Sequence, residues 1–215
     1  VQVGRMGGGG GGGGGGIVGA TNLGTIFKGS RRVRGSLSAT HTSDLDQFTI
    51  PWKSQVKIQL SGLKGDADVQ LLDANGNVLA TSSQPGRRGE VITLTLGPGT
   101  YGIRTYLATS GATPYSLSVS VRPMPVSGTL SGSHTSDMYA LTLASTSRVS
   151  ILLAGLRHDA ELQLLDASQN VLATASRPKR HTQSITMSLG PGTYYVKPSV
   201  VDPAGTPYRL TVNVK

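Results

Sequence analysis

Apolar and polar residues alternate along most of the chain after residue 35, with the period of two residues that a half-buried β-strand requires. Residues 54–61 show the pattern most clearly, with Val56, Ile58 and Leu60 on one face and polar side chains on the other. Turn-forming residues separate such segments about every 8–12 residues. We therefore expect about eight short strands in residues 20–122 and no helix.

The hydrophobic pattern then repeats. The hexapeptide Leu-Gly-Pro-Gly-Thr-Tyr occurs at residues 96–101 and again at residues 189–194, and residues 35–122 align with residues 128–215 at the same offset of 93 without a gap. Each repeat has the length of a small domain and the strand pattern of two packed antiparallel sheets. The prediction is an all-β protein with two tandem jelly-roll-like antiparallel β-sandwiches, residues 20–122 and 123–215, behind an extended N-terminal arm, residues 1–19.

The arm contains an unbroken run of glycines between short apolar segments. Val1 and Val3 alternate with a glutamine as in a strand, and Ile17 and Val18 follow the run. The ten glycines are Gly7, Gly8, Gly9, Gly10, Gly11, Gly12, Gly13, Gly14, Gly15 and Gly16. Glycine loses the most backbone entropy on ordering, so one interpretation is a flexible tether. The other is that the arm, about 31–35 Å over the run when extended, docks on another subunit by adding a strand to a sheet edge.

The charge balance is basic, but the charges are not gathered in one segment. The formal net charge is +9 with only 14% charged residues. Arg87 and Arg88 of the first repeat occupy the same loop as Lys179 and Arg180 of the second. These loops are either solvated or in contact with a polyanion, such as an acidic polysaccharide or a neighbouring subunit. Nucleic acid is not expected, because one Trp, two Phe and seven Tyr offer few stacking surfaces.

Four aspartates of the first repeat are candidate calcium ligands: Asp44, Asp46, Asp66 and Asp68. Calcium takes about 6–8 oxygen ligands, and clustered carboxylates with loop carbonyls supply them. The alternative is that these aspartates accept hydrogen bonds from local amides at turns. The second repeat replaces Asp46 with Tyr139 and Asp68 with Glu161. Apart from this possible calcium site, no cofactor is expected.

Residue types of a hydrolase triad occur in each repeat, as His41 with Asp44 and as His134 with Asp137. They lie in one turn, and the sequence has no serine on a strand-to-helix elbow of the G-x-S-x-G type. The absence of cysteine also excludes a disulfide framework and a thiolate metal site. No apolar run approaches the ~18–20 residues of a membrane helix. We therefore expect a protein that is not an enzyme and has no membrane span.

The ordered set of motifs resembles the bacterial pre-peptidase C-terminal (PPC) domain. In the first repeat the resemblance rests on residues 22–25, 35–37, 44–49, 65–73, 97–101 and 114–117, and in the second on Asp137 and residues 158–166, 190–194 and 207–210. The resemblance implies a jelly-roll-like β-sandwich, secretion, and usually a place beside a peptidase or another secreted enzyme. Some members bind calcium, and some are thought to contact insoluble polymers such as collagen. The polyglycine arm has no counterpart in the family pattern.

Two functions follow as hypotheses. The first is a non-catalytic structural protein, secreted by a bacterium to the cell surface or beyond, whose copies form a homopolymeric filament, sheath or surface layer through the glycine arm. The second is an accessory module of a secreted enzyme. It would bind a polysaccharide or protein polymer through the basic loops and exposed aromatic residues such as Trp52 and Tyr106.

Overall fold

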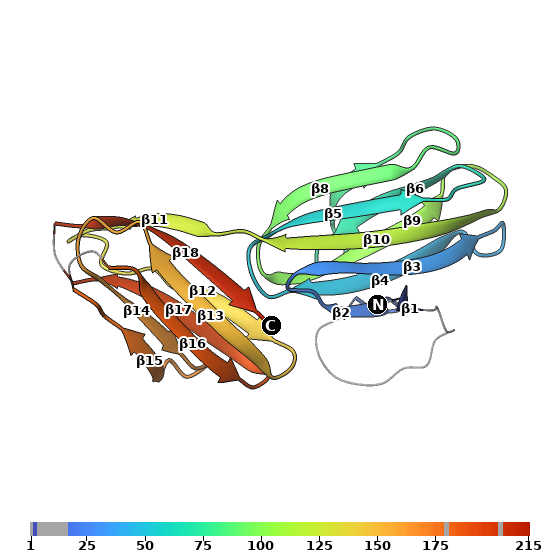
Figure 1. Ribbon diagram of the computed structural model, residues 1–215. Coiled ribbons are helices and arrows are strands. Elements are labelled where there is room, and N and C mark those ends of the chain that lie inside the picture. The colour runs from blue at the N-terminus through green and yellow to red at the C-terminus, as the bar shows by residue number, and fades with distance from the viewer. Residues whose placement is uncertain (1, 4–16, 179–180, 202–203) are drawn as a thin grey trace. The chain divides into compact units, whose positions relative to one another are not determined.

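The structure, a computed structural model, describes residues 2–3, 17–178, 181–201 and 204–215. These residues form β-strands joined by turns and contain no helix, and hence no helix that could cross a membrane (Figure 1). The predicted all-β class is confirmed. The chain divides into two compact units: unit 1 comprises residues 1–50 and 54–122, and unit 2 comprises residues 51–53 and 123–215.

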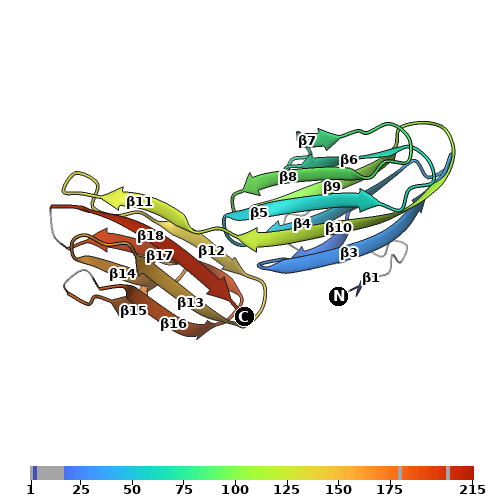
Figure 2. The same ribbon diagram turned by 45° about the horizontal axis from the view of Figure 1, so that its top comes forward.

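Unit 1 consists of two sheets, with strand orders β1-β3-β10-β5-β8 and β2-β4-β9-β6-β7. Strand β7, labelled in Figure 2, lies next to β6 at the outer edge of the second sheet. The strands are β1 (Gln2–Val3), β2 (Thr21–Thr25), β3 (Gly29–Leu37), β4 (Ser43–Ile50), β5 (Ser54–Ser61), β6 (Ala67–Leu72), β7 (Val78–Ser82), β8 (Glu90–Leu96), β9 (Gly99–Leu107) and β10 (Thr113–Pro123).

Unit 2 has two four-stranded sheets, with orders β11-β18-β13-β16 and β12-β17-β14-β15. Its strands are β11 (Val126–Leu130), β12 (Tyr139–Leu143), β13 (Ser147–Ala154), β14 (Ala160–Leu165), β15 (Val171–Ala175), β16 (Gln183–Leu189), β17 (Gly192–Val200) and β18 (Thr206–Val214). At the offset of 93 residues, β11 to β18 correspond one by one to β3 to β10.

The strand order in both units is that of a jelly roll. Successive strands from β3 onward change sheet at each step, except that β6 and β7 form a hairpin within one sheet. This alternation pairs the first strand with the last, β3 with β10 and β11 with β18, in antiparallel register. The predicted jelly-roll-like sandwich is therefore confirmed.

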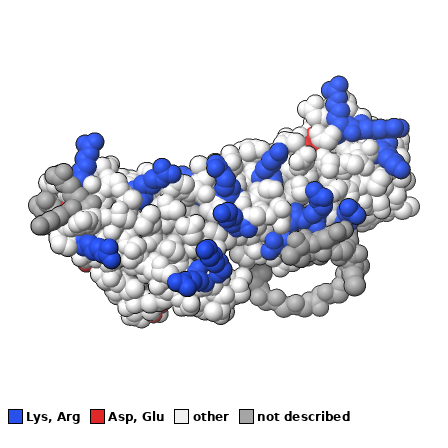
Figure 3. Space-filling view, viewed as in Figure 1, with Lys and Arg blue, Asp and Glu red and all other residues white. Residues whose placement is uncertain are grey.

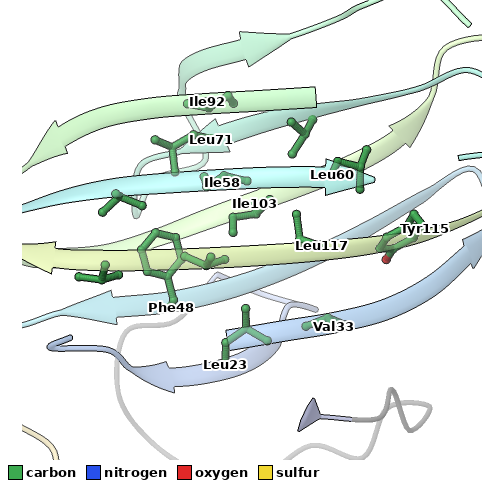
Figure 4. Close-up of a cluster of buried hydrophobic side chains, with 14 of the residues drawn as sticks. Leu23, Val33, Phe48, Ile58, Leu60, Leu71, Ile92, Ile103, Tyr115 and Leu117 are labelled. Carbon is green, nitrogen blue, oxygen red and sulfur yellow. The ribbon is translucent and has the colours of Figure 1, made fainter. Parts of the chain in front are cut away.

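The core of unit 1 lies between its two sheets (Figure 4). Because side chains alternate along a strand, every second residue of β5 is buried, and Ile58 and Leu60 are fully enclosed. Phe48 from β4 and Ile103 from β9 meet them from the other sheet and are also fully buried. Each such side chain contributes roughly 1.5–3 kcal/mol to folding.

Two N-terminal segments extend the sheets of unit 1. Strand β1 pairs in parallel with β3, with Val3 opposite Val33. Strand β2 pairs in parallel with β4, with Thr21 opposite Asp46 and Thr25 opposite Thr49. Leu23 within β2 and Ile26 directly after it join the core with 5% and 1% of their surface exposed. At the offset of 93 residues, β2 falls within β10, so unlike the eight strands that follow it, it has no counterpart among the described strands of unit 2.

The repeated hexapeptide is a turn that enters β9 and β17. The Tyr101 hydroxyl donates to the carbonyl oxygen of Gly97 at 2.9 Å, and the Tyr194 hydroxyl donates to that of Gly190 at 3.0 Å. The tyrosine thus closes the corner from which its own strand starts. The glycine-rich hexapeptide is therefore a structural turn in both units.

Candidate functional site

A hydrogen-bonded histidine, aspartate and tyrosine connect the two sheets of unit 1. Asp44 lies on β4 with its side chain among the buried residues, and its Oδ1 is 2.9 Å from Nε2 of His41. Its Oδ2 accepts a hydrogen bond of 2.6 Å from the hydroxyl of Tyr115, which comes from β10 of the facing sheet. Gly35 leaves room for this ring, since a Cβ there would lie 2.5 Å from the Tyr115 ring atom Cζ.

The same three residues recur in unit 2 with one addition. His134 Nε2 is 3.0 Å from Asp137 Oδ1, and the Tyr208 hydroxyl donates to Asp137 Oδ2 at 2.5 Å. Tyr139, which replaces Asp46, places its hydroxyl 2.5 Å from that of Tyr208. Burial, followed by the hydrogen bond to Asp137, raises the pKa of Tyr208 far above its ordinary value. The tyrosine therefore remains a neutral donor, and both aspartate oxygens are engaged in a structural tie.

Three of the four candidate calcium ligands lie on strands of one sheet, divided between its two faces. Asp44 and Asp46 share the inward direction of Phe48 on β4, whereas Asp68 alternates with the core residues Ala67 and Val69 on β6 and so points outward. Burial raises the pKa of Asp68, and a hydrogen bond with Tyr106 partly offsets that rise. Asp66 lies just before β6, and its Oδ1 is buried without a hydrogen-bond partner in the described part of the chain. Within the described residues, no three acidic or histidine side chains converge on a position that could hold a metal ion.

A buried polar residue anchors the basic loop of each unit. Glu90 of β8 is fully buried and accepts hydrogen bonds from the Ser82 hydroxyl at 2.5 Å and from the Gln84 amide at 2.8 Å. This fixes the loop on which Arg87 and Arg88 are exposed. Sequence reasoning missed the anchor. The sequence feature that could have indicated this anchor is the acidic residue Glu90 at the start of the otherwise uncharged, alternating strand β8.

In unit 2 the corresponding anchor is neutral. Gln183 accepts from the Arg177 amide at 2.7 Å and donates to the carbonyl oxygens of Arg177 and His181, each at 2.8 Å. The candidate contact residues Lys179 and Arg180 lie outside the described residues. Figure 3 shows Lys and Arg side chains spread over the visible surface of each unit, not collected in one patch.

The expectation that Trp52 is an exposed aromatic residue is wrong. Residues 51–53 belong to unit 2, where Trp52 is 2% exposed. The ring centroids of Trp52 and Tyr139 are 5.9 Å apart. The Nε1–H of Trp52 donates to the carbonyl oxygen of Met124 at 3.0 Å. Tyr106 is half-buried, with the Arg104 guanidinium 5.4 Å from its ring centroid. A pair of exposed rings for stacking on a polymer is therefore not present at these two positions.

The described ends of the N-terminal arm both lie against unit 1. The Ile17 amide donates to Gln47 Oε1 at 2.7 Å, and its side chain occupies space left by Gly102, where a Cβ would lie 2.5 Å from Ile17 Cδ1. Val18 is 94% exposed. Val1 and the predicted contact residues Gly7 to Gly16 lie outside the described residues. On the C-terminal side of the glycine run, the described contact with unit 1 is therefore made by Ile17.

Comparison with known proteins gives one family match. Residues 42–107, from the turn before β4 to the end of β9, match the family described as Bacterial pre-peptidase C-terminal domain. The predicted resemblance is confirmed for this part of unit 1. No curated protein matches the chain.

Several solved structures are similar to this chain. The pre-peptidase C-terminal domain of collagenase from Bacillus anthracis is 22% identical, with a TM-score of 0.38, over 42% of this chain and 88% of that one. PliG from Aeromonas hydrophila, a periplasmic lysozyme inhibitor, is 16% identical, with a TM-score of 0.34, over 48% of this chain and 97% of that one. The PBSX exported protein XepA is 11% identical, with a TM-score of 0.31, over 84% of each chain.

Proposed function

We propose that this chain is a non-catalytic extracellular structural protein of a bacterium, and that its copies join through the N-terminal arm into a homopolymeric filament, sheath or surface layer. The observation that carries the proposal is strand addition. The N-terminal region supplies β1 in parallel to β3 and β2 in parallel to β4, and each added strand forms an outer edge of its sheet in unit 1. Segments from this end of the chain are therefore suited to extending sheet edges.

The non-catalytic and extracellular parts of the proposal have separate support. The triad-like residues form a structural tie. One carboxylate oxygen of Asp44 is hydrogen-bonded to His41, and the other accepts a hydrogen bond from Tyr115. The extracellular part is supported by the match of residues 42–107 to the bacterial pre-peptidase C-terminal domain. We propose that unit 2 is a second copy of the same domain, because its strand order repeats that of unit 1.

Deleting residues 1–16 tests the proposal. The deletion keeps Ile17 and β2, so the fold of unit 1 is expected to survive, which a thermal melt of the truncated chain checks. Negative-stain microscopy and sedimentation should show ordered assemblies for the full chain and dispersed particles for the truncated one. Assemblies that form equally well without the arm would refute its role.

The accessory-module function remains the second candidate, and the exposure of Arg87 and Arg88 favours it. Their loop is anchored by buried Glu90, so the two guanidinium groups project from a fixed base. A chain that stays monodisperse and co-sediments with an insoluble acidic polymer would support this function over assembly.

A further inference from the structure

Unit 2 lacks the strand that covers the edge of the corresponding sheet in unit 1. Strand β2 lies outside β4, whereas among the described residues no strand lies outside β12. The offset of 93 residues explains the difference. It places the counterpart of Thr21–Thr25 at residues 114–118, and these residues are already part of β10, paired with β3. Residues 114–118 are therefore part of a sheet of unit 1 and are not available to pair with β12.

The burial of equivalent residues shows the effect of the missing strand. On the outward face of β4, Leu45, Gln47 and Thr49 are half-buried. Their equivalents on unit 2, Met138, Ala140 and Thr142, are all exposed, and Met138 is 46% exposed. The two inward leucines of β12 stay enclosed, since Leu141 and Leu143 are 0% and 5% exposed. The sandwich of unit 2 is thus packed inside but incomplete at this edge.

The backbone of β12 is oriented to accept a strand. In unit 1 the Ile26 amide donates to the carbonyl oxygen of Thr49 at 2.8 Å, so that carbonyl points away from β9 toward the N-terminal segment. Thr142 is the equivalent of Thr49, and its N–H and C=O therefore point to the open edge. Exposed edges are usually protected by lysine, proline or a bulge. Residues 139–143 carry no lysine or proline, and their pairing with β17 has no bulge.

We propose that the outer edge of β12 is the acceptor for the N-terminal arm, residues 1–16, of a second copy of this chain. This inference rests on the proposed function and identifies the surface that receives the arm. Strand β2 itself is a poor donor, because Leu23 and Ile26 belong to the core of unit 1 and their removal would open β4. The arm lies ahead of both repeats, so pairing with β12 would displace at most β1 from β3 and would leave β2 to β18 in place.

The glycine run suits the surface beside β12. In unit 1 the N-terminal segment places Ile17 over Gly102, but the equivalent of Gly102 in unit 2 is Tyr195, which lies opposite Ala140. A side chain like that of Ile17 would meet this ring. A strand of glycines adds no side chain and can approach closely while its amides and carbonyls pair with β12.

This geometry gives each chain one donor and one acceptor. Because the two surfaces differ, the contact is heterologous, and it generates an open chain of subunits or a closed ring. Assembly through one donor and one acceptor therefore has a stoichiometry that assembly through identical faces would not share.

Thr142→Pro tests the acceptor edge. Proline removes the N–H that faces the incoming strand and puts its ring in the way, yet is tolerated at sheet edges. The matched control is Thr129→Pro on β11, the exposed outer strand of the other sheet of unit 2. With both variants folded by thermal melt, we expect Thr142→Pro to abolish assembly and Thr129→Pro to retain it.

Mixing two defective variants gives the sharper measurement. The chain without residues 1–16 keeps the acceptor, and Thr142→Pro keeps the donor. Neither should assemble alone, and together they should form a 1:1 heterodimer and nothing larger by size-exclusion chromatography with light scattering. If arm deletion abolishes assembly but Thr142→Pro assembles normally, the acceptor assignment is overturned and the role of the arm stands. If arm deletion changes nothing, the proposed function itself fails.

A cysteine pair tests the same contact if the Thr142→Pro variant does not fold. The chain has no cysteine of its own, so Gly10→Cys in one copy and Ala140→Cys in another are the only thiols present. Under mild oxidation we expect a disulfide-linked heterodimer on a non-reducing gel. Ser127→Cys on β11 in place of Ala140→Cys is the control. Equal cross-linking of the two acceptor positions would overturn the assignment to β12.

Discussion

Gly35 and Gly128 show how single residues determine the structural tie in each unit. A Cβ at Gly35 would lie 2.5 Å from the Tyr115 hydroxyl oxygen, and one at Gly128 would lie 2.6 Å from that of Tyr208. The tyrosine reaches the aspartate of the other sheet only across a strand position without a side chain. The tie therefore depends on a glycine as much as on the residues that form the hydrogen bonds.

We predict that Gly35→Ala lowers the free energy of unfolding of unit 1 by about 1–3 kcal/mol, the usual cost of overpacking. The new methyl group would displace the Tyr115 ring and weaken its hydrogen bond to Asp44. Gly97→Ala is the matched control, because a Cβ there meets nothing within 4 Å. Urea unfolding of both variants measures the difference. Equal stability of the two would contradict the steric argument.

The turn after β6 gives a prediction on pH. Asp73 accepts hydrogen bonds from the Asn77 side chain and backbone and from the Asn75 amide, and these lower the pKa of Asp73 below its ordinary value of 3.8. The ionised form is favoured by folding. Its contribution to stability is therefore complete above pH 3.8 and is lost as the pH falls through the lower, folded-state pKa.

We expect Asn77→Ala to move the pKa of Asp73 back toward 3.8 and to reduce the loss of stability in acid. Carboxyl carbon chemical shifts followed through a pH titration measure the change. Asp166 of the same variant is an internal control. Asn170, which is not mutated, gives Asp166 the same contacts and lowers its pKa in the same way. An unchanged Asp73 titration in the variant would show that Asn77 is not the cause.

At the scale of elements, a buried threonine fixes the loop before β6 to the start of β10. Thr113 is 1% exposed, and its Oγ1 accepts from the amides of Lys64 and Gly65 at 2.8 and 3.1 Å. Thr206 does the same for the amides of Arg157 and His158 in unit 2. One side chain thus satisfies two loop donors in each sandwich.

Thr113→Val should destabilise unit 1 by about 1–3 kcal/mol, because it keeps the shape of the side chain but leaves both amides without an acceptor. Thr113→Ser retains the hydroxyl and should recover most of the loss. Hydrogen exchange of the Lys64 and Gly65 amides, read beside denaturant unfolding, locates the effect. Unchanged protection of these amides in the valine variant would disprove the role of Thr113.

The elements of the fold were predictable where local pattern determines them. The alternation of residues 54–61 predicted β5, and the two faces of β4 were also readable, because Asp44 has the parity of the core residue Phe48. Strand β2, Thr21–Thr25, was not predicted because it has no alternation of its own and exists through non-local pairing with β4. The sequence repeat alone would predict the same neighbouring strands for β4 and β12. The observed strand order shows instead that β2 lies outside β4 and that no described strand lies outside β12.

At the scale of the whole molecule, the positive charge is a distributed property. The net charge is +9, and Figure 3 shows basic side chains over the visible surface of each unit. Salt screens exposed charges over about 8 Å at physiological ionic strength. A charge pattern of this kind attracts polyanions without providing a site that recognises one. The structural and accessory functions therefore predict different responses to the removal of arginines.

We expect binding to dextran sulfate to weaken steeply with salt, and Arg87→Ser with Arg88→Ser to lower the affinity only about two- to tenfold at low salt. The matched control is Arg32→Ser with Arg34→Ser, which removes two exposed arginines of β3. If the charge acts as a whole, the two double variants lose affinity equally in a titration at fixed ionic strength. A much larger loss for the variant of the Arg87 loop would identify a specific polyanion site and would favour the accessory function over assembly.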